Sequence, residues 1–221
     1  MRALIFDLDG TLIDSVYAHV LAWQKSFAAK GLQVPAWSIH NKIGLGGNEL
    51  AQAVGLELGK PVSKDEAEGM DKRHSAIIKE LLPHAEPLPG AAALLRRLTE
   101  THVPWGIATS GDRTGVEKAL RSLSLPDDIT VVCKSDVEHA KPEPDLFLAC
   151  QERLKIPAKD CFVVGDAVWD MLAARRSGML GIGVLTGGMG RSELIQAGAY
   201  WVYGDTSELD ARRYELGLVL G

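Results

Sequence analysis

The chain has 221 residues, of which 46% are hydrophobic and 24% charged, a composition that excludes a disordered or fibrous protein and fits one domain with at most a smaller insert. Its net charge of −5 at pH 7 has the wrong sign for a nucleic-acid-binding surface, so we expect no nucleic-acid partner. The longest apolar run, 179–185, is too short to cross a membrane, and no signal-peptide pattern stands at the N-terminus. We therefore expect a cytoplasmic protein without membrane association, with three reduced, buried cysteines: Cys133, Cys150 and Cys161.

The first predicted element is a strand over residues 3–6, a short apolar run of the kind that is buried on both faces of a parallel sheet. Residues 15–86 then follow helical periodicity, and no convincing strand pattern interrupts them. The Pro- and Gly-rich segment 84–90 is typical of a connection back to another layer. We therefore predict a helical insert over 15–86 within a larger domain formed by 1–14 and 87–221.

From residue 91 onward the pattern alternates between helix and strand. Helices are predicted over 91–100, 115–123, 145–154 and 169–177, and strands over 103–109, 129–133, 161–164 and 181–185. This alternation predicts an α/β fold with a Rossmann-like parallel sheet and helices on both faces. No strand is followed by GxGxxG and no Walker A sequence is present, which argues against a nucleotide-binding dehydrogenase.

Two carboxylates follow the first predicted strand directly. Asp7 and Asp9 are two residues apart, so their side chains can point the same way, and Gly10 allows a sharp turn after them. The carboxyl edge of a parallel sheet is where ligands bind, which favours a functional pair. The alternative is an acidic turn that caps a helix, because Asp, Gly and Thr are common turn residues.

Two further segments carry groups suited to an anion. Thr109, Ser110 and Gly111 end a predicted strand with two hydroxyls and flexible backbone amides, an arrangement that can hold a phosphate, although taken alone the turn fits an ordinary strand-to-helix cap better. Lys141 lies in a Pro-stiffened segment, which suits a rigidly held, charge-stabilising ammonium. Its alternative is a solvated surface lysine.

A second acidic pair follows the predicted strand 161–164. Asp166 lies at the end of that strand, and Asp170 lies one helical turn later on the same side. With Asp7 and Asp9, four carboxylates would meet at one sheet edge, which is unfavourable unless a cation and a lysine offset their charges. The all-oxygen ligand set points to Mg²⁺ rather than zinc.

Taken in order, these segments resemble the four motifs of the haloacid dehalogenase-like superfamily, and the resemblance covers nearly the whole chain. The motif residues are Asp7, Asp9, Gly10 and Thr11; Thr109 and Ser110; Lys141; and Gly165, Asp166 and Asp170. The insert 15–86 resembles the helical cap of the subclass that includes phosphoglycolate phosphatase and β-phosphoglucomutase. The resemblance implies a phosphatase with an α/β core domain and an all-helical cap domain.

The same resemblance implies a role for each carboxylate of the first pair. Asp7 would be the nucleophile that forms an aspartyl-phosphate. Asp9 would protonate the leaving alcohol and then deprotonate the hydrolytic water, and we expect its pKa to be raised by its acidic neighbours. Superfamily dehalogenases and phosphonatases lack an acid at the position of Asp9, so its presence favours a phosphatase or a phosphomutase.

The resemblance also assigns the phosphate and metal sites. Thr109, the amides around Ser110 and Gly111, and Lys141 would hold the phosphoryl oxygens. Mg²⁺ would lie between Asp7, the backbone carbonyl of Asp9 and Asp166. Asp170 would be a metal ligand or would anchor the site from close by.

A glycine-rich loop in the cap, 42–48, is expected to face the active site and to help choose the substrate; a plain turn between helices is the alternative. Its candidate residues are Lys42, Gly44, Gly46, Gly47 and Asn48. Mutases that resemble β-phosphoglucomutase carry an Arg in this loop, and this loop has none, although Lys42 could replace it. We therefore predict hydrolysis of a small phosphorylated metabolite, such as a sugar, polyol or glycolate-like phosphate, with a mutase or a non-catalytic binding protein as alternatives.

The histidines and tryptophans give no further site. The six histidines are scattered without metal-ligand spacing and are predicted to be surface or capping residues: His19, His40, His74, His84, His102 and His139. The five tryptophans are predicted to pack in the core or at a domain interface.

Overall fold

The computed structural model describes residues 2–125 and 129–218. Its sheet has six parallel strands in the order β3-β2-β1-β4-β5-β6. They are β1 (Ala3–Phe6), β2 (Trp105–Ala108), β3 (Thr130–Val132), β4 (Cys161–Gly165), β5 (Leu180–Val184) and β6 (Ala199–Tyr203). The predicted Rossmann-like α/β fold is confirmed.

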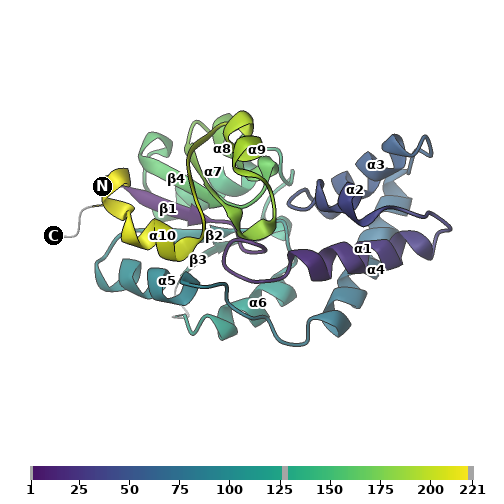
Figure 1. Cartoon of the computed structure of the whole chain (residues 1–221), viewed down its shortest axis with the longest axis horizontal. Coiled ribbons are helices and arrows are strands. Elements are labelled where there is room, and N and C mark those ends of the chain that lie inside the picture. Colours follow the sequence, from purple (N-terminus) through teal and green to yellow (C-terminus); the bar gives the residue numbers. More distant parts are fainter. Residues whose placement is uncertain (1, 126–128, 219–221) are drawn as a thin grey trace.

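Helices cover both faces of this sheet (Figure 1). Helices α5 (Ala91–Glu100), α6 (Arg113–Ser122) and α10 (Thr206–Ala211) pack on one face, where Leu4 and Phe6 of β1 point. Helices α7 (Asp145–Leu154) and α8 (Val168–Arg176) pack on the other, where Ala3 and Ile5 point. Successive side chains of β1 therefore pack into two different apolar cores, as expected of a strand without an exposed face.

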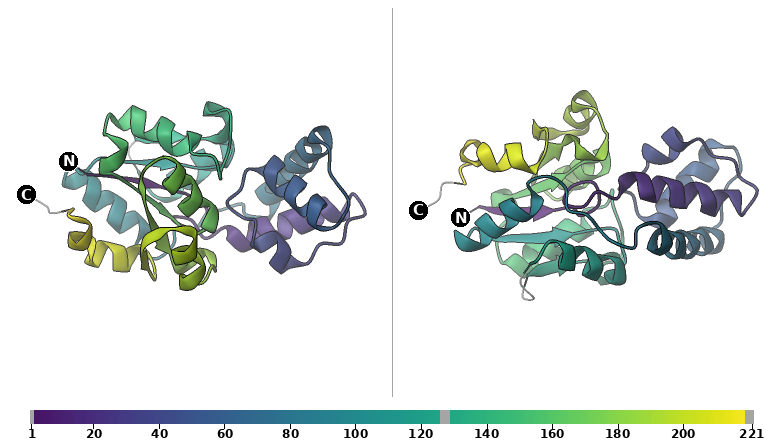
Figure 2. Two further views of the ribbon diagram at one scale, coloured as in Figure 1. Left: turned by 90° about the horizontal axis from the view of Figure 1, so that it is seen from above. Right: turned by 60° about the horizontal axis from the view of Figure 1, so that its bottom comes forward.

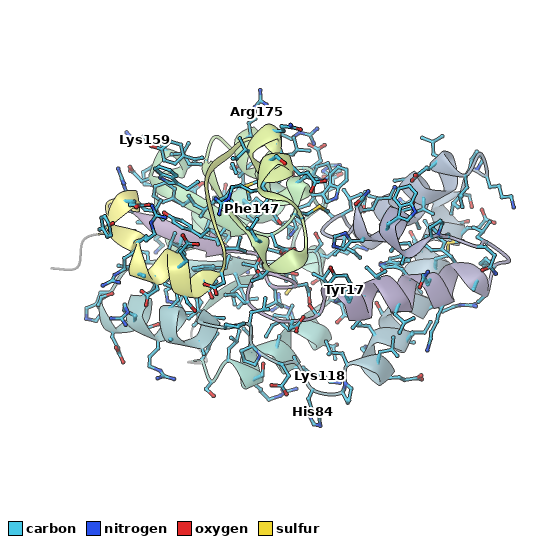
Figure 3. All side chains as sticks on the ribbon, in the orientation of Figure 1. Tyr17, His84, Lys118, Phe147, Lys159 and Arg175 are labelled. Atoms are coloured by element: carbon cyan, nitrogen blue, oxygen red, sulfur yellow. The ribbon has the colours of Figure 1, made fainter. Side chains whose placement is uncertain are left out.

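The side chains follow this layering (Figure 3). Phe147 of α7 is fully enclosed, whereas Lys159 and Arg175 are exposed. The three cysteines are free and buried, as predicted. Among the helices of residues 2–125 and 129–218, none combines the length and the apolar character that a membrane crossing demands.

The predicted elements differ from the observed ones mainly at their ends and after residue 185. Strands predicted over 103–109 and 129–133 are confined to β2 and β3, and the helix predicted over 115–123 begins two residues earlier. No element was predicted for α9 (Arg191–Ala197), β6 or α10. The last strand escaped prediction because it lies at the sheet edge and its Tyr200 and Trp201 are exposed.

Four helices between β1 and α5 form a separate group beyond the carboxyl ends of the strands (Figure 2). They are α1 (Val16–Ala28), α2 (Ala36–His40), α3 (Gly47–Glu57) and α4 (Lys64–Leu81). Apolar residues of all four, among them Trp23, Phe27 and Leu50, make a core of their own. Helix α4 begins at a capping box in which Ser63 and Glu66 satisfy each other's backbone amides.

The chain enters and leaves this helical group along two adjacent segments. Asp14 donates its backbone N–H to the Glu86 carbonyl at 2.9 Å, and Leu88 donates to the Leu12 carbonyl at 2.9 Å. Ile13 and Pro87 form an isolated antiparallel bridge between the same segments. The two connections are therefore hydrogen-bonded to each other beside the end of β1.

Candidate active site

The polar side chains that follow three neighbouring strands meet at one edge of the sheet. Asp7 follows β1, Thr109 follows β2 and Asp166 follows β4, and β1 lies between the other two strands. Parallel strands bring their carboxyl ends to the same edge, so this arrangement is a direct result of the strand order. The Asp7 N–H donates to the Val164 carbonyl at 2.8 Å, which continues the β1–β4 pairing up to the site.

Lys141 is buried at the centre of this edge, with 1% of the residue exposed. Its Nζ lies 2.6 Å from Asp7 Oδ1 and 2.8 Å from Asp170 Oδ1. The alternative of a solvated surface lysine is therefore wrong. Burial alone would lower the pKa of Lys141, but the carboxylates of Asp170 and Asp7 raise it, so the ammonium stays charged.

Three buried carboxylates surround this ammonium. Asp7, Asp166 and Asp170 each offer an oxygen, and these atoms all lie within 4.8 Å of one another. Thr11 donates its hydroxyl to Asp166 Oδ1 at 2.8 Å, and the N–H of Ala167 donates to Asp170 Oδ2 at 3.0 Å. These hydrogen bonds hold the Asp166 and Asp170 carboxylates in place beside Asp7, close enough together to share one cation.

The crowded carboxylates carry more negative charge than Lys141 offsets. Burial, together with the neighbouring carboxylates, raises the pKa of Asp7 to about 7 and that of Asp166 well above its usual range. A divalent cation bound between these three carboxylates would remove this repulsion. Carboxylate oxygens are the ligands that hard divalent cations prefer. The donor set thus fits a divalent metal, in keeping with the predicted metal site.

Gly10 makes room for the Asp166 carboxylate. Its φ of +83° is a conformation that favours glycine, and a Cβ at this position would overlap the Asp166 carboxylate. A Cβ on Gly187, in the turn after β5, would overlap the same carboxylate. Both backbones therefore approach Asp166 closely only because they lack a side chain.

Asp9 faces a different set of partners from Asp7. Its Oδ1 accepts a hydrogen bond from Ser15 Oγ at 2.6 Å and lies 3.3 Å from His19 Nε2. Burial alone would raise the pKa of Asp9, but the charge and hydrogen bond of His19, with the hydrogen bond from Ser15, lower it to about 2. The prediction that acidic neighbours raise this pKa is wrong, because His19 and Ser15 stabilise the Asp9 carboxylate.

His19 and His74 are site residues that the prediction of surface or capping histidines missed. His74 is 8% exposed, and its Nε2 lies 3.0 Å from His19 Nδ1. The His74 ring also stacks on Trp23, with centroids 4.4 Å apart. One signal was available in the sequence: His19 lies one helical turn after Ser15, at the start of the helix that follows the first motif.

We expect His74 to make stability depend on pH. Burial and the adjacent His19 lower the pKa of His74 well below its ordinary value of 6.5. Unfolded chains therefore bind more protons than folded ones just below pH 6.5, so the free energy of unfolding should fall as pH drops through this range. Urea unfolding at about pH 7.5 and about pH 5 should show a smaller loss in His74→Phe than in wild type. Equal losses would contradict this assignment.

The predicted phosphate-binding turn borders a cavity of about 180 Å³ beside Asp7 and Asp9. Thr109, Ser110 and Gly111 all line this cavity. The Gly111 N–H donates to Thr109 Oγ1 at 3.0 Å, which holds the turn in a fixed shape. The turn thus presents hydroxyl and backbone groups to the same space as the two carboxylates.

The glycine-rich loop 42–48 contributes only in part to this cavity. Gly44 and Gly47 line it, whereas the described lining does not include Gly46, Asn48 or Lys42. Lys42 turns away to Glu57 and donates to the Ser38 carbonyl at 3.2 Å, which argues against its predicted role in substrate choice. The loop nevertheless contacts the sheet edge. Ser110 donates to the Gly44 carbonyl at 3.3 Å, and the N–H of Gly46 donates to the carbonyl of Lys141 at 3.3 Å.

Aromatic residues form a second contact between the helical group and the sheet edge. Tyr17, at the junction in Figure 3, stacks on His40 with centroids 5.5 Å apart. His40 Nε2 lies 2.8 Å from the Gly187 carbonyl, and Trp169 donates its indole N–H to the Asn41 carbonyl at 3.2 Å. The cavity is therefore bordered by the sheet edge on one side and the helical group on the other.

Comparisons with known proteins agree with this geometry. The family model for haloacid dehalogenase-like hydrolases matches residues 1–178. The chain is 30% identical to β-phosphoglucomutase of Bacillus subtilis over 95% of this chain and 92% of that protein, and 34% identical to fructose-1-phosphate phosphatase of Escherichia coli over 80% and 92%. A hydrolase from Pseudomonas syringae has a similar structure, with a TM-score of 0.94 and 40% identity over 97% of this chain and 99% of that one.

The chain therefore belongs to the haloacid dehalogenase-like hydrolase family. Within that family it is a phosphoric monoester hydrolase, because several of its relatives are named phosphatases. Members of this family generally use a divalent metal, and the buried carboxylates Asp7, Asp166 and Asp170 are the residues that could hold one here.

Proposed function

We propose that this protein hydrolyses the phosphate monoester of a sugar or polyol, with Mg²⁺ as its metal and Asp7 as its nucleophile. The observation that carries the proposal is the buried cluster of Lys141 with three carboxylates, of which Lys141 and Asp7 line the cavity. The named activities of two relatives, fructose-1-phosphate phosphatase and hexitol phosphatase A of Escherichia coli, support the substrate class.

In the first step, a carboxylate oxygen of Asp7 attacks the substrate phosphorus, and the bond from phosphorus to the alcohol oxygen breaks. The leaving oxygen takes a proton from the pair formed by Asp9 and His19. Because His19 lowers the pKa of Asp9 to about 2, the proton resides on His19 Nε2 and is shared with Asp9 Oδ1, which makes the two residues one acid–base unit.

In the second step, water attacks the phosphorus of the aspartyl-phosphate and gives its proton to Asp9. The bond from phosphorus to the Asp7 oxygen breaks, so inorganic phosphate leaves and the free carboxylate returns. Lys141 and the turn 109–111 hold the phosphoryl oxygens in both steps and offset the charge that develops on them. Both oxygens of Asp170 are engaged, by Lys141 Nζ and by the Ala167 N–H, so we assign Asp170 to positioning Lys141.

When it is bound by Asp7, Asp166 and the backbone carbonyl of Asp9, Mg²⁺ would add positive charge beside the phosphoryl oxygens. We further propose that residues 15–86 form a cap domain over a core of 1–14 and 87–221. The contacts of Gly44 and Gly46 with the sheet edge support a cap that excludes bulk water from the attack of Asp7.

Removing divalent metal should remove the activity. We expect EDTA treatment to reduce phosphate release from an aryl phosphate by about 100-fold or more, because the metal neutralises charge that Lys141 alone cannot. Added Mg²⁺ should restore the rate, and Asp166→Asn should need more Mg²⁺ to reach half its maximal rate. Full activity after chelation would contradict the proposed metal dependence.

A phosphomutase is the second candidate, supported by the similarity to β-phosphoglucomutase along nearly the whole chain. Phosphorus NMR of a hexose phosphate, with and without a trace of hexose bisphosphate, separates the two functions. A phosphatase releases inorganic phosphate in both samples, whereas a mutase converts one isomer into another and depends on the bisphosphate.

A further inference from the structure

A second group of polar residues lines the cavity where helix α4 meets the sheet domain. It comprises His74 and Asp71 of α4 and Lys134, which follows β3. Lys134 Nζ lies 2.7 Å from Asp71 Oδ2 and so ties α4 to the sheet domain. None of these residues belongs to the four motifs, and the proposed chemistry does not use them.

One atom of this group lacks a partner. His74 Nδ1 is buried and has no hydrogen-bond partner among the described residues. Its Nε2 lies 3.0 Å from His19 Nδ1, and the ring face stacks on Trp23. Because these contacts fix the ring, Nδ1 is held in place, and an unsatisfied buried nitrogen costs free energy unless a ligand completes it.

The carboxylate beside this nitrogen is equally well fixed. Asp71 Oδ1 lies 3.9 Å from His74 Nδ1, too far for a direct hydrogen bond, while Oδ2 is held by Lys134. The carboxylate packs on the backbone of Gly47, where any Cβ would overlap it. His74 Nδ1 and Asp71 Oδ1 thus form a pair of polar atoms separated by about the gap that one bridging oxygen fills.

We propose that His74 and Asp71 bind a hydroxyl group on the alcohol portion of the substrate. A hydroxyl group whose oxygen lies about 2.8 Å from both atoms would give each of them a hydrogen-bond partner. The hydroxyl can donate to Asp71 Oδ1, and it can accept from or donate to His74 Nδ1. This inference rests on the proposed phosphatase function and assigns two residues of that site to recognition of a substrate hydroxyl.

Other substrate groups fit the pair less well. A carboxylate or a second phosphate only accepts hydrogen bonds at neutral pH, so it would face Asp71 Oδ1 with charge repulsion. An apolar chain would leave His74 Nδ1 unsatisfied. The pair therefore selects against a glycolate-like acid and a bisphosphate, and Ile78, Leu82 and Val116 of the lining offer apolar contact to the C–H faces of a sugar or polyol.

The test compares two phosphate esters with six-carbon chains that differ in their hydroxyls, glucitol 6-phosphate and n-hexyl phosphate, together with an aryl phosphate. We expect His74→Phe, which can still stack on Trp23, and Asp71→Asn each to lower kcat/KM for glucitol 6-phosphate by about 10- to 100-fold. A loss that reaches the chemistry through the contact of His74 with His19 should fall on all three esters alike, so the ratio of kcat/KM for glucitol 6-phosphate to kcat/KM for n-hexyl phosphate should fall by about 10- to 100-fold in both variants. His139→Phe is the matched control, because His139 pairs with Asp145 on the surface, with its side chain 59% exposed.

Equal losses on all three esters would overturn the proposal, since they would mean that His74 acts through His19 or through the fold. Wild type that does not prefer glucitol 6-phosphate over n-hexyl phosphate would overturn it as well.

Calorimetric binding of glucitol 6-phosphate to Asp7→Asn, with and without His74→Phe or Asp71→Asn, separates this question from the proposed function. If no ester is hydrolysed but either second change weakens binding about tenfold or more, the hydroxyl site stands and the phosphatase function fails. Unchanged binding in both double variants would reject the site.

Discussion

Asp7→Asn should lower phosphate release by on the order of 10⁴-fold or more, whatever the ester. An amide cannot attack phosphorus as a carboxylate does, and no other described carboxylate has both Lys141 at 2.6 Å and a place at the end of β1. The variant should fold at least as stably as wild type, because it removes one of three mutually repelling buried carboxylates. Initial rates on an aryl phosphate and a thermal unfolding curve check both parts.

The matched control for this variant is Asp65→Asn, which changes an exposed carboxylate in the first turn of α4. It should keep the wild-type rate. Mass spectrometry should accompany the assay, so that Asn converted back to Asp is recognised. A verified Asp7→Asn protein that retained more than about a hundredth of the wild-type rate would exclude Asp7 as the nucleophile.

Lys141→Met should cost both activity and stability. The change removes the ammonium that contacts Asp7 and Asp170, and breaking a buried ion pair from one side typically costs about 3–5 kcal/mol. Without the ammonium, burial and mutual repulsion disfavour the charged form of the remaining carboxylates. Their pKa in the folded state therefore rises above its value in the unfolded state, and they bind protons. Stability that depends on such protons is lost as pH rises, so the deficit relative to wild type should be larger at about pH 8 than at about pH 5.

Urea unfolding at the two pH values measures this deficit, and phosphate release measures the loss of phosphoryl binding. Lys159→Met is the control, because Lys159 is exposed on the far surface from the cavity (Figure 3). A deficit that is the same at both pH values would show that Lys141 contributes by packing rather than by pairing with the carboxylates.

The sequence was sufficient to predict five of the six strands, β1 to β5, and the carboxylates and hydroxyls at the carboxyl edge of the sheet. Strands buried on both faces leave continuous apolar runs, and each run here ends directly before a polar group such as Asp7, Thr109 or Asp166. Because the strands are parallel, residues distant in the chain must meet once the strand order is right. Lys141 needed the resemblance to a known family, since a loop lysine has no periodicity that shows its burial.

The contacts across the cavity could not be predicted in the same way. His19 and His74 are separated by 55 residues and meet only because α1 and α4 pack together, which no spacing rule describes. The pKa of Asp9 was predicted in the wrong direction for this reason: its acidic neighbours are visible in the sequence, and His19 is visible only in the fold. The amphipathic pattern predicts which face of a helix is buried, but it does not predict which other helix packs against that face.

The paired connections at Asp14–Glu86 and Leu12–Leu88 allow the segment between them to vary in sequence and length without disturbing the sheet. An insertion that departs from and returns to the sheet at one point can be lengthened, trimmed or exchanged while the strands keep their register. With the hydroxyl site proposed on α4, mutations in α1 to α4 that keep His19 would redirect the enzyme to a new alcohol, while Asp7, Lys141 and Asp166 remain undisturbed at the sheet edge. For the engineer, the same two adjacent segments are the natural boundaries at which to graft the insert of a relative onto this core.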